Sequence, residues 1–588
     1  MKIEGVSSNK QSAKSEVEKP KNVIQKTEIH SADNRNSVIG DRRTSENYAR
    51  FKLNNTLEAN FRPLSADRAE AAAERTRQTA SKPKTFTTPE GVPAAEAYFT
   101  TPGTEVPELT AEQIKDNDGP MAQAMFYRAL DQHKDDAEWL HRFYQTLGTD
   151  KTAELIQDTV SSLPPAGERE RDLLGSSLQT LNRGGYLTEG DMDALLGKVA
   201  VTDGSIHKGA AMFLTEAISN VSNDSAGLSL KNMFAESTAN LATGNLPLNV
   251  DGENQNEAKD FLAAMATHTI ASTPDYNQAA KLNGLRYSLG ESGLQELFSR
   301  AMKLDQWLLP PDGQARENFD NVGTLLKTLS THSFALPNTR VAVFNAVTRN
   351  LTGDAAEKYN GDANFKDGLA DIFMKDFNSI LKSSYGDGKY TNGIDFLKGQ
   401  GLENFFRSVV FSSEPSSKAN DVVQFLGSKM REISTAIENN DQNYLKLLSK
   451  DGNTPLSRNE AANVMGHLFG LAGAAFKDYA DSLPNEAAKR TAWFGFVVNV
   501  VSGTAGNAPA NPAVGGLLGA ITDEIGGRIH DNMTQQELEN LSREFAEKLG
   551  IDNPEEFIKR LVSEIRDSFA EGNEFAQTFG TVSGIPLN

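Results

Sequence analysis

The densest group of residues able to hold a metal ion lies in the segment HKDDAEWLH, residues 133–141. His133 and His141 flank three carboxylates there. On a helix, a separation of eight residues turns the two imidazoles about 80° apart, so one ion could not bind both without ligands from elsewhere. We therefore expect a solvated polar helix face, and we predict no metal site in the chain.

A second segment, LNRGGYLTEGDMDALL (residues 181–196), has the outline of a calcium loop followed by a helix. A calcium loop needs acidic or amide side chains at alternating early positions and a glutamate at the twelfth. With Gly185 at the glycine position, the early positions are Thr180, Asn182 and Gly184, and the last is Asp191. These supply too few oxygen ligands. The segment instead predicts a Gly-Gly turn with Thr188 as the N-cap of a helix.

Two glycine-containing stretches partly match nucleotide-binding or catalytic motifs. In SYGDGKYT (residues 384–391), Lys389 is followed by Tyr390 where a phosphate loop has serine or threonine. In LGESGLQE (residues 289–296), the spacing misses the nucleophile elbow by one residue. Neither stretch is interpreted as a site. The sequence thus predicts no cofactor and leaves any catalytic residue unknown.

Residues 491–522, TAWFGFVVNVVSGTAGNAPANPAVGGLLGAIT, carry no charged side chain. A membrane-spanning helix needs about 20 apolar residues, and neither half reaches that length before Pro509 and Pro512 interrupt the segment. We favour helices buried in a soluble core, with a membrane-inserting hairpin as the alternative. The candidate residues in either case are the large apolar ones: Trp493, Phe494, Phe496, Val497, Val498, Val500, Leu517, Leu518 and Ile521.

Composition limits the classes of protein that this chain can belong to. The 588 residues contain no cysteine, which excludes a disulfide scaffold, a thiolate zinc site and a cysteine nucleophile. The net charge of −20 is uneven: residues 1–100 hold 17 Lys/Arg against 13 Asp/Glu, which leaves 42 against 66, or −24, for residues 101–588. Such an acidic body repels phosphate backbones, so we predict that it binds no nucleic acid.

Helix signals dominate the chain from residue 106 onward. Capping boxes are predicted at Thr110 with Gln113, Ser457 with Glu460, and Thr534 with Glu537. Proline follows a potential N-cap at Thr273 and at Asn553. Alternating apolar runs are rare, so the sequence predicts an all-α body. Breaks in composition divide it into helical blocks at about 106–245, 250–450 and 451–588.

Residues 1–105 are predicted to be a disordered polar arm, because apolar residues are sparse and breakers recur. The start has no apolar core of a classical signal peptide. Its serine, asparagine, lysine and glutamine content resembles the unstructured, uncleaved export signals of type III secreted bacterial proteins. The resemblance implies synthesis in a bacterial cytoplasm, secretion without a classical signal peptide, and a secretion machine or chaperone as the partner of this arm.

Taken together, the polar arm, the absence of cysteine, the acidic helical body and the uncharged segment at 491–522 resemble bacterial secreted effectors and polymorphic toxins. This resemblance implies delivery to a target cell, where the body binds a target component such as a protein or a membrane. One alternative is a helical translocator or pore-forming protein that uses the 491–522 hairpin, as colicin-like proteins do. The other is an enzyme whose scattered catalytic residues lie in 250–450.

Overall fold

The computed structural model describes residues 106–161, 167–304, 321–385, 400–483 and 571–585, together with the single residues 559, 562, 563 and 566. All of them belong to one compact unit, Pro63–Asn588. The predicted disordered arm at 1–105 and the uncharged segment at 491–522 lie outside the described residues.

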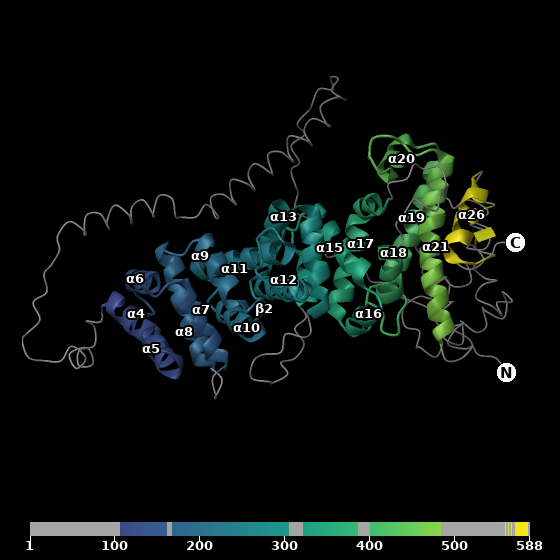
Figure 1. Cartoon of the computed structure of the whole chain (residues 1–588). Coiled ribbons are helices and arrows are strands. Elements are labelled where there is room, and N and C mark those ends of the chain that lie inside the picture. Colours follow the sequence, from purple (N-terminus) through teal and green to yellow (C-terminus); the bar gives the residue numbers. More distant parts are fainter. Residues whose placement is uncertain are drawn as a thin grey trace, which may run out of the picture. The chain divides into compact units, whose positions relative to one another are not determined.

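The described residues are helical almost throughout, which confirms the prediction of an all-α body (Figure 1). The helices are α4 (Pro107–Lys115), α5 (Gly119–His133), α6 (Ala137–Leu147), α7 (Thr149–Ser161), α8 (Glu168–Gly184), α9 (Glu189–Val199), α10 (Lys208–Ser219), α11 (Ser225–Thr243), α12 (Gln255–Ala271), α13 (Asp275–Leu304), α14 (Asn321–Thr331), α15 (Pro337–Asn350), α16 (Asp354–Lys358), α17 (Ala363–Ser384), α18 (Gln400–Phe405), α19 (Ala419–Glu438), α20 (Gln442–Leu448), α21 (Arg458–Ser482) and α26 (Gly572–Ser583). A π-helix, η1, spans Phe406–Val410 directly after α18.

A short hairpin is the one sheet among the described residues. Strands β1 (Val201–Thr202) and β2 (Ser205–Ile206) pair antiparallel. Asp203 and Gly204 join them with φ angles of 51° and 72°. Two consecutive positive φ angles define the tight turn that matches the twist of a hairpin, and Asp-Gly is a favoured pair for it.

Two of the predicted helix starts are confirmed and one is wrong. Ser457 with Glu460 caps α21, and Thr188 with Asp191 caps α9 in the same reciprocal way. Thr110 lies inside α4 instead, because Pro107 begins that helix three residues earlier. Its hydroxyl donates to the carbonyl of Val106. A threonine that can bond the carbonyl four residues back fits within a helix, so the same residue type does not mark a cap.

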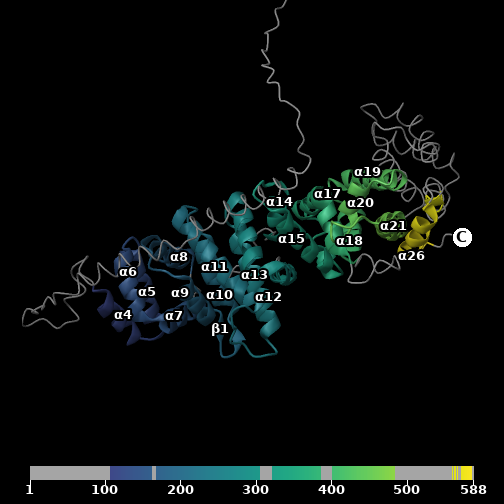
Figure 2. The same ribbon diagram turned by 90° about the horizontal axis from the view of Figure 1, so that it is seen from above.

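Most helices pack on helices close to them in the sequence, whereas α21 packs most extensively on α26, which begins 90 residues after α21 ends. Helix α11 packs on α8, α9 and α12, and α13 packs on α12, α14 and α15 (Figure 2). Helix α17 then packs on α14 and α15, and α21 packs on α18, α19, η1 and α26. The interior between α15, α17 and η1 is rich in phenylalanine: the ring of Phe373 lies 4.7 Å from Phe405 and 5.8 Å from Phe406, centroid to centroid. These rings pack where α18 passes into the start of η1.

The predicted block boundaries near 245–250 and 450 fall between helices. Helix α11 ends at Thr243 and α12 begins at Gln255, and α20 ends ten residues before α21 begins at Arg458. Helix α11 also packs directly on α12, so apolar contacts continue past the first boundary. The division into three blocks stays a prediction.

Candidate interaction surface

Four large apolar side chains are exposed where α13 meets the loop between α14 and α15. Tyr276 and Tyr287 of α13 are 49% and 82% exposed, and Phe334 and Leu336 of the loop are 55% and 41% exposed. The two tyrosines are eleven residues apart, which places them on one face of the helix, about 16 Å from each other along its axis.

Asn283 holds the loop on this face of α13. It lies between the tyrosines in sequence, seven residues after Tyr276 and four before Tyr287, and therefore on nearly the same side of the helix. Its Nδ2 donates to the carbonyl of Phe334 (2.7 Å), and its Oδ1 accepts from the backbone N–H of Leu336 (3.2 Å). The loop thus crosses α13 between the two tyrosines. We call the four exposed side chains the α13 surface.

A buried ion pair also holds the loop that carries Phe334 and Leu336. Arg340 of α15 donates to the carbonyl of Ala335 and to both carboxylate oxygens of Asp376 on α17. Both charged residues are buried, and α17 departs from helical dihedrals at Asp376. His332 stacks on Phe334, with 5.5 Å between ring centroids. The backbone that carries Phe334 and Leu336 is therefore held by polar contacts from both α13 and α15.

Clustering gives these side chains a significance that scattered apolar residues lack. Single exposed apolar residues are normal on soluble proteins, whereas a contiguous patch marks an interaction site. Aromatic side chains dominate the centres of protein interfaces because they bury a large area with few rotatable bonds. A backbone held in place before binding also loses less entropy when a partner docks. The α13 surface has three exposed aromatic side chains on or beside one helix face, and its loop backbone is held by hydrogen bonds.

Helix α13 changes direction at Gly290, just after Tyr287. The residue has φ 74° and ψ 177°, a conformation essentially restricted to glycine. This glycine belongs to the LGESGLQE stretch, so the near-match to a nucleophile elbow is the kink of a helix. The kink separates the half of α13 that carries the tyrosines from a second half with a different set of contacts.

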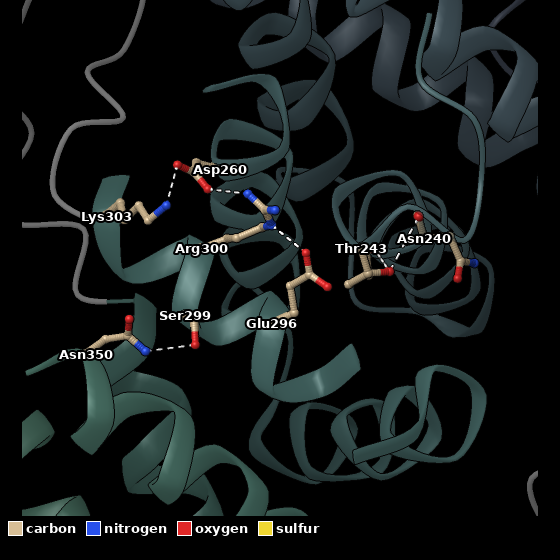
Figure 3. Close-up of polar contacts among 9 residues, drawn as sticks. Asn240, Thr243, Asp260, Glu296, Ser299, Arg300, Lys303 and Asn350 are labelled. Carbon is tan, nitrogen blue, oxygen red and sulfur yellow. Dashed lines mark hydrogen bonds and ion pairs between the residues drawn. The ribbon is translucent and has the colours of Figure 1, made fainter. Parts of the chain in front are cut away.

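Charged and polar contacts fix that second half to α12 and α15. Figure 3 shows Asp260 of α12 bridging two cations of α13: Arg300 and Lys303 each lie 2.9 Å from one of its oxygens. Arg300 also pairs with Glu296 at 2.9 Å. Asn350 of α15 donates to Ser299 at 2.8 Å. The network contains two anions and two cations, so it has no excess charge to offer a ligand. It stabilises the packing of α13 on α12.

The sequence motifs weighed as metal sites have structural partners instead. The expected single helix face at 133–141 is wrong, because His133 ends α5 and His141 lies in α6. His133 stacks on Trp139 at 3.8 Å, and His141 stacks on Tyr186 at 4.5 Å, so the two imidazoles face different aromatic rings. Burial lowers the pKa of His141. The calcium-like segment is a turn with Gly185 at φ 74°, followed by α9 with its Thr188 cap, as predicted. No group of three or more metal-ligating side chains is present within the described residues.

The residues predicted as core or membrane hairpin, Trp493 to Ile521, lie outside the described residues, as do residues 386–391 of the phosphate-loop-like stretch. In the part of the chain that the structure does describe, we find no helix with the length and apolar character to span a bilayer. The choice between core and membrane hairpin at 491–522 stays a prediction.

No protein-family model matches this chain, and no curated protein sequence matches it either.

Proposed function

We propose that the chain is a bacterial effector or toxin, exported to a target cell, whose helical body acts by binding a protein of that cell through the α13 surface. The observation that carries the binding part is the cluster of Tyr276, Tyr287, Phe334 and Leu336 around Asn283. The net charge of −24 over residues 101–588 favours a basic partner, since complementary charge speeds encounter and selects partners.

Site-specific photo-crosslinking in target cells tests the binding part. A photoreactive phenylalanine analogue replaces Tyr287, and in a control protein it replaces Met121, which is 63% exposed on α5. We expect one major adduct from position 287, absent at position 121, and weakened in a variant that also carries Phe334→Ser. Equal adducts from both positions, or none from position 287, would contradict the proposed surface.

The delivery part rests on the polar segment at the N-terminus and is tested separately. Residues 1–100 are fused to a reporter in a bacterial strain with an active secretion system, and a fusion of residues 107–206 serves as the control. We expect export of the first fusion alone, together with binding of a secretion chaperone to the same segment. Export of neither fusion, or of both equally, would remove the support for delivery without affecting the crosslinking result.

The pore-forming alternative depends on residues 491–522 and has its own test. Liposome leakage is measured for the wild type and for Val497→Asp at about pH 7 and about pH 5, since a charge in the hydrocarbon of a bilayer is costly. From a core location we expect no leakage by the wild type and a large loss of thermal stability in the variant. Leakage by the wild type that Val497→Asp abolishes at unchanged stability would favour a pore instead.

A further inference from the structure

A buried lysine contacts a serine hydroxyl in the loop that follows η1. Lys366 lies in the first turns of α17 and is 3% exposed. Its Nζ lies 3.1 Å from Oγ of Ser412 and 3.0 Å from Oδ1 of Asn360, and it also bonds the carbonyl of Glu414. Ser412 is half-buried, whereas the next three residues of the loop are exposed. Ser412 is therefore partly accessible to solvent.

The three partners of Lys366 differ in what they can donate. The side-chain oxygen of Asn360 and the carbonyl of Glu414 only accept hydrogen bonds, whereas a serine hydroxyl both donates and accepts. An ammonium gives one hydrogen to each partner. A neutral amine gives its two hydrogens to the two acceptors, and its lone pair accepts the hydrogen of Ser412. All three contacts are thus satisfied in both protonation states, so Lys366 can lose its proton without losing a hydrogen bond.

The surroundings of Lys366 favour the neutral amine. Burial lowers the pKa of Lys366 to about 8, while Glu414 and Asp362 act in the opposite direction. The other charged groups nearby are occupied: Asp367 accepts from Ser416 and Ser417, and Asp371 pairs with Lys418. Asn360 is also held, because its Nδ2 donates to Oγ of Ser413 at 3.1 Å, which directs its oxygen toward Lys366.

The loop itself is tied to the end of η1. The N–H of Phe411 donates to the carbonyl of Phe406 (2.7 Å), and the N–H of Ser416 donates to the carbonyl of Val409 (2.8 Å). A π-helix stores a locally unfavourable backbone and is frequent at functional sites. Here it ends one residue before Phe411 and two before Ser412, and so sets where the hydroxyl lies. A nucleophile needs such a fixed position relative to its base.

We propose that Ser412 is a nucleophile and Lys366 its general base, in acyl transfer from an ester or amide substrate. Neutral Lys366 takes the proton of Ser412 as Oγ attacks the carbonyl carbon of the acyl group. The bond to the leaving group then breaks, and the ammonium of Lys366 returns the proton to the departing alcohol or amine. Water, activated by the same amine, hydrolyses the acyl-serine and restores the hydroxyl. This activity is independent of the α13 surface.

A fluorophosphonate probe tests the pair on the full-length protein. The probe reacts with an activated serine by attack of Oγ at phosphorus and loss of fluoride, and intact mass with peptide mapping locates the adduct. We expect one adduct, on Ser412, at a rate that rises from about pH 7 to about pH 9 as Lys366 loses its proton. The more exposed Ser413, which lacks the lysine contact, is the internal control. No adduct in the wild type over this range, or equal labelling of both serines, would overturn the proposal and leave Lys366 as a clamp for the loop.

Three variants distinguish a Lys366 that acts as a general base from one that only holds the loop in place. Ser412→Ala is expected to abolish labelling. Lys366→Arg keeps a permanent charge and its donors but cannot accept a proton, so we expect a loss of about 100-fold or more in rate with a folded protein. Asn360→Asp places a carboxylate beside the amine and is expected to move the pH profile up by about one unit. A residue that only supports the fold would leave that profile in place, so an unchanged midpoint would contradict the assignment of Lys366.

Discussion

Two loops of this protein are each held by one side chain of a neighbouring helix, with opposite results. Asn283 of α13 fixes residues 332–336 through two bonds to backbone atoms. Lys366 of α17 fixes residues 412–414 through a hydroxyl and a backbone carbonyl. The side-chain amide of Asn283 does not titrate, and the loop that it holds exposes the apolar side chains of Phe334 and Leu336 to solvent. The amine can change its charge and lies against a hydroxyl. The first arrangement suits binding, and the second suits proton transfer.

A second buried lysine shows why the partner matters more than burial. Lys231 of α11 is 2% exposed, and burial lowers its pKa to about 8, as it does for Lys366. Its Nζ donates to the amide oxygen of Asn223 (2.8 Å) and to the carbonyl of Ser272 (3.5 Å). Neither of these oxygens can return a proton. Lys231 and Lys366 thus share a lowered pKa, but Lys231 makes only structural contacts, whereas Lys366 is a candidate general base.

The largest effect is expected from the ion pair beneath the first loop. Asp376→Ala leaves Arg340 buried without its carboxylate, and breaking a buried pair in this way costs about 3–5 kcal/mol of unfolding free energy. Because Arg340 also bonds Ala335, amide exchange in residues 332–336 should rise as well. Urea unfolding and hydrogen exchange measure both effects. The control is Glu108→Ala, which removes the exposed pair with Arg142 and should change stability by less than about 1 kcal/mol.

Stability should depend on pH through the two buried lysines. Each has a folded pKa near 8 against an ordinary value of 10.5. Between these values the unfolded chain holds a proton that the folded chain has lost, so stability rises with pH, by at most about 1.4 kcal/mol per pH unit for each lysine. Below about pH 8 both lysines are protonated in the folded and in the unfolded protein. The free-energy cost of burying their charges then lowers the stability by its full amount.

Replacing either lysine with methionine should flatten this slope, whereas Asn283→Ala should leave it unchanged. Denaturant unfolding of the wild type and the three variants is measured at several pH values between those two limits. All four proteins share their other titratable groups, so the differences in slope isolate the lysine contribution. A slope that survives both methionine variants would mean that the lysines keep ordinary pKa values in the folded protein.

Asn283→Ala should have a smaller effect on stability. It removes two partly buried hydrogen bonds to the loop, each worth about 1 kcal/mol, which amounts to about 2 kcal/mol. Exchange of the amide of Leu336 should become faster, while the amide of Phe411, in the residue before Ser412, stays protected. Equal changes at both loops would show that the two loops are coupled and are not held independently by Asn283 and Lys366.

The sequence predicted the helices and their caps better than the sites, for a physical reason. Ser457 with Glu460 and Thr188 with Asp191 work over three residues, so local pattern contains the whole interaction. No strand was predicted at 201–206, although Asp-Gly is a pair that favours the turn found there. By contrast, Asn283 meets Phe334 across 51 residues and Lys366 meets Ser412 across 46. Nothing in a single sequence states which distant residues become neighbours.

Binding of the crosslinked target protein tests the central claim most directly. Once the adduct at position 287 identifies that protein, calorimetry gives its affinity for the wild type, for Tyr287→Ser with Phe334→Ser, and for the control Met121→Ser with Leu447→Ser, two residues that are 63% and 47% exposed on α5 and α20. We expect the first pair to weaken binding about 100-fold or more and the control pair less than about 3-fold, with all three proteins equally stable. Equal affinities for the three proteins would show that the α13 surface is not where the target binds.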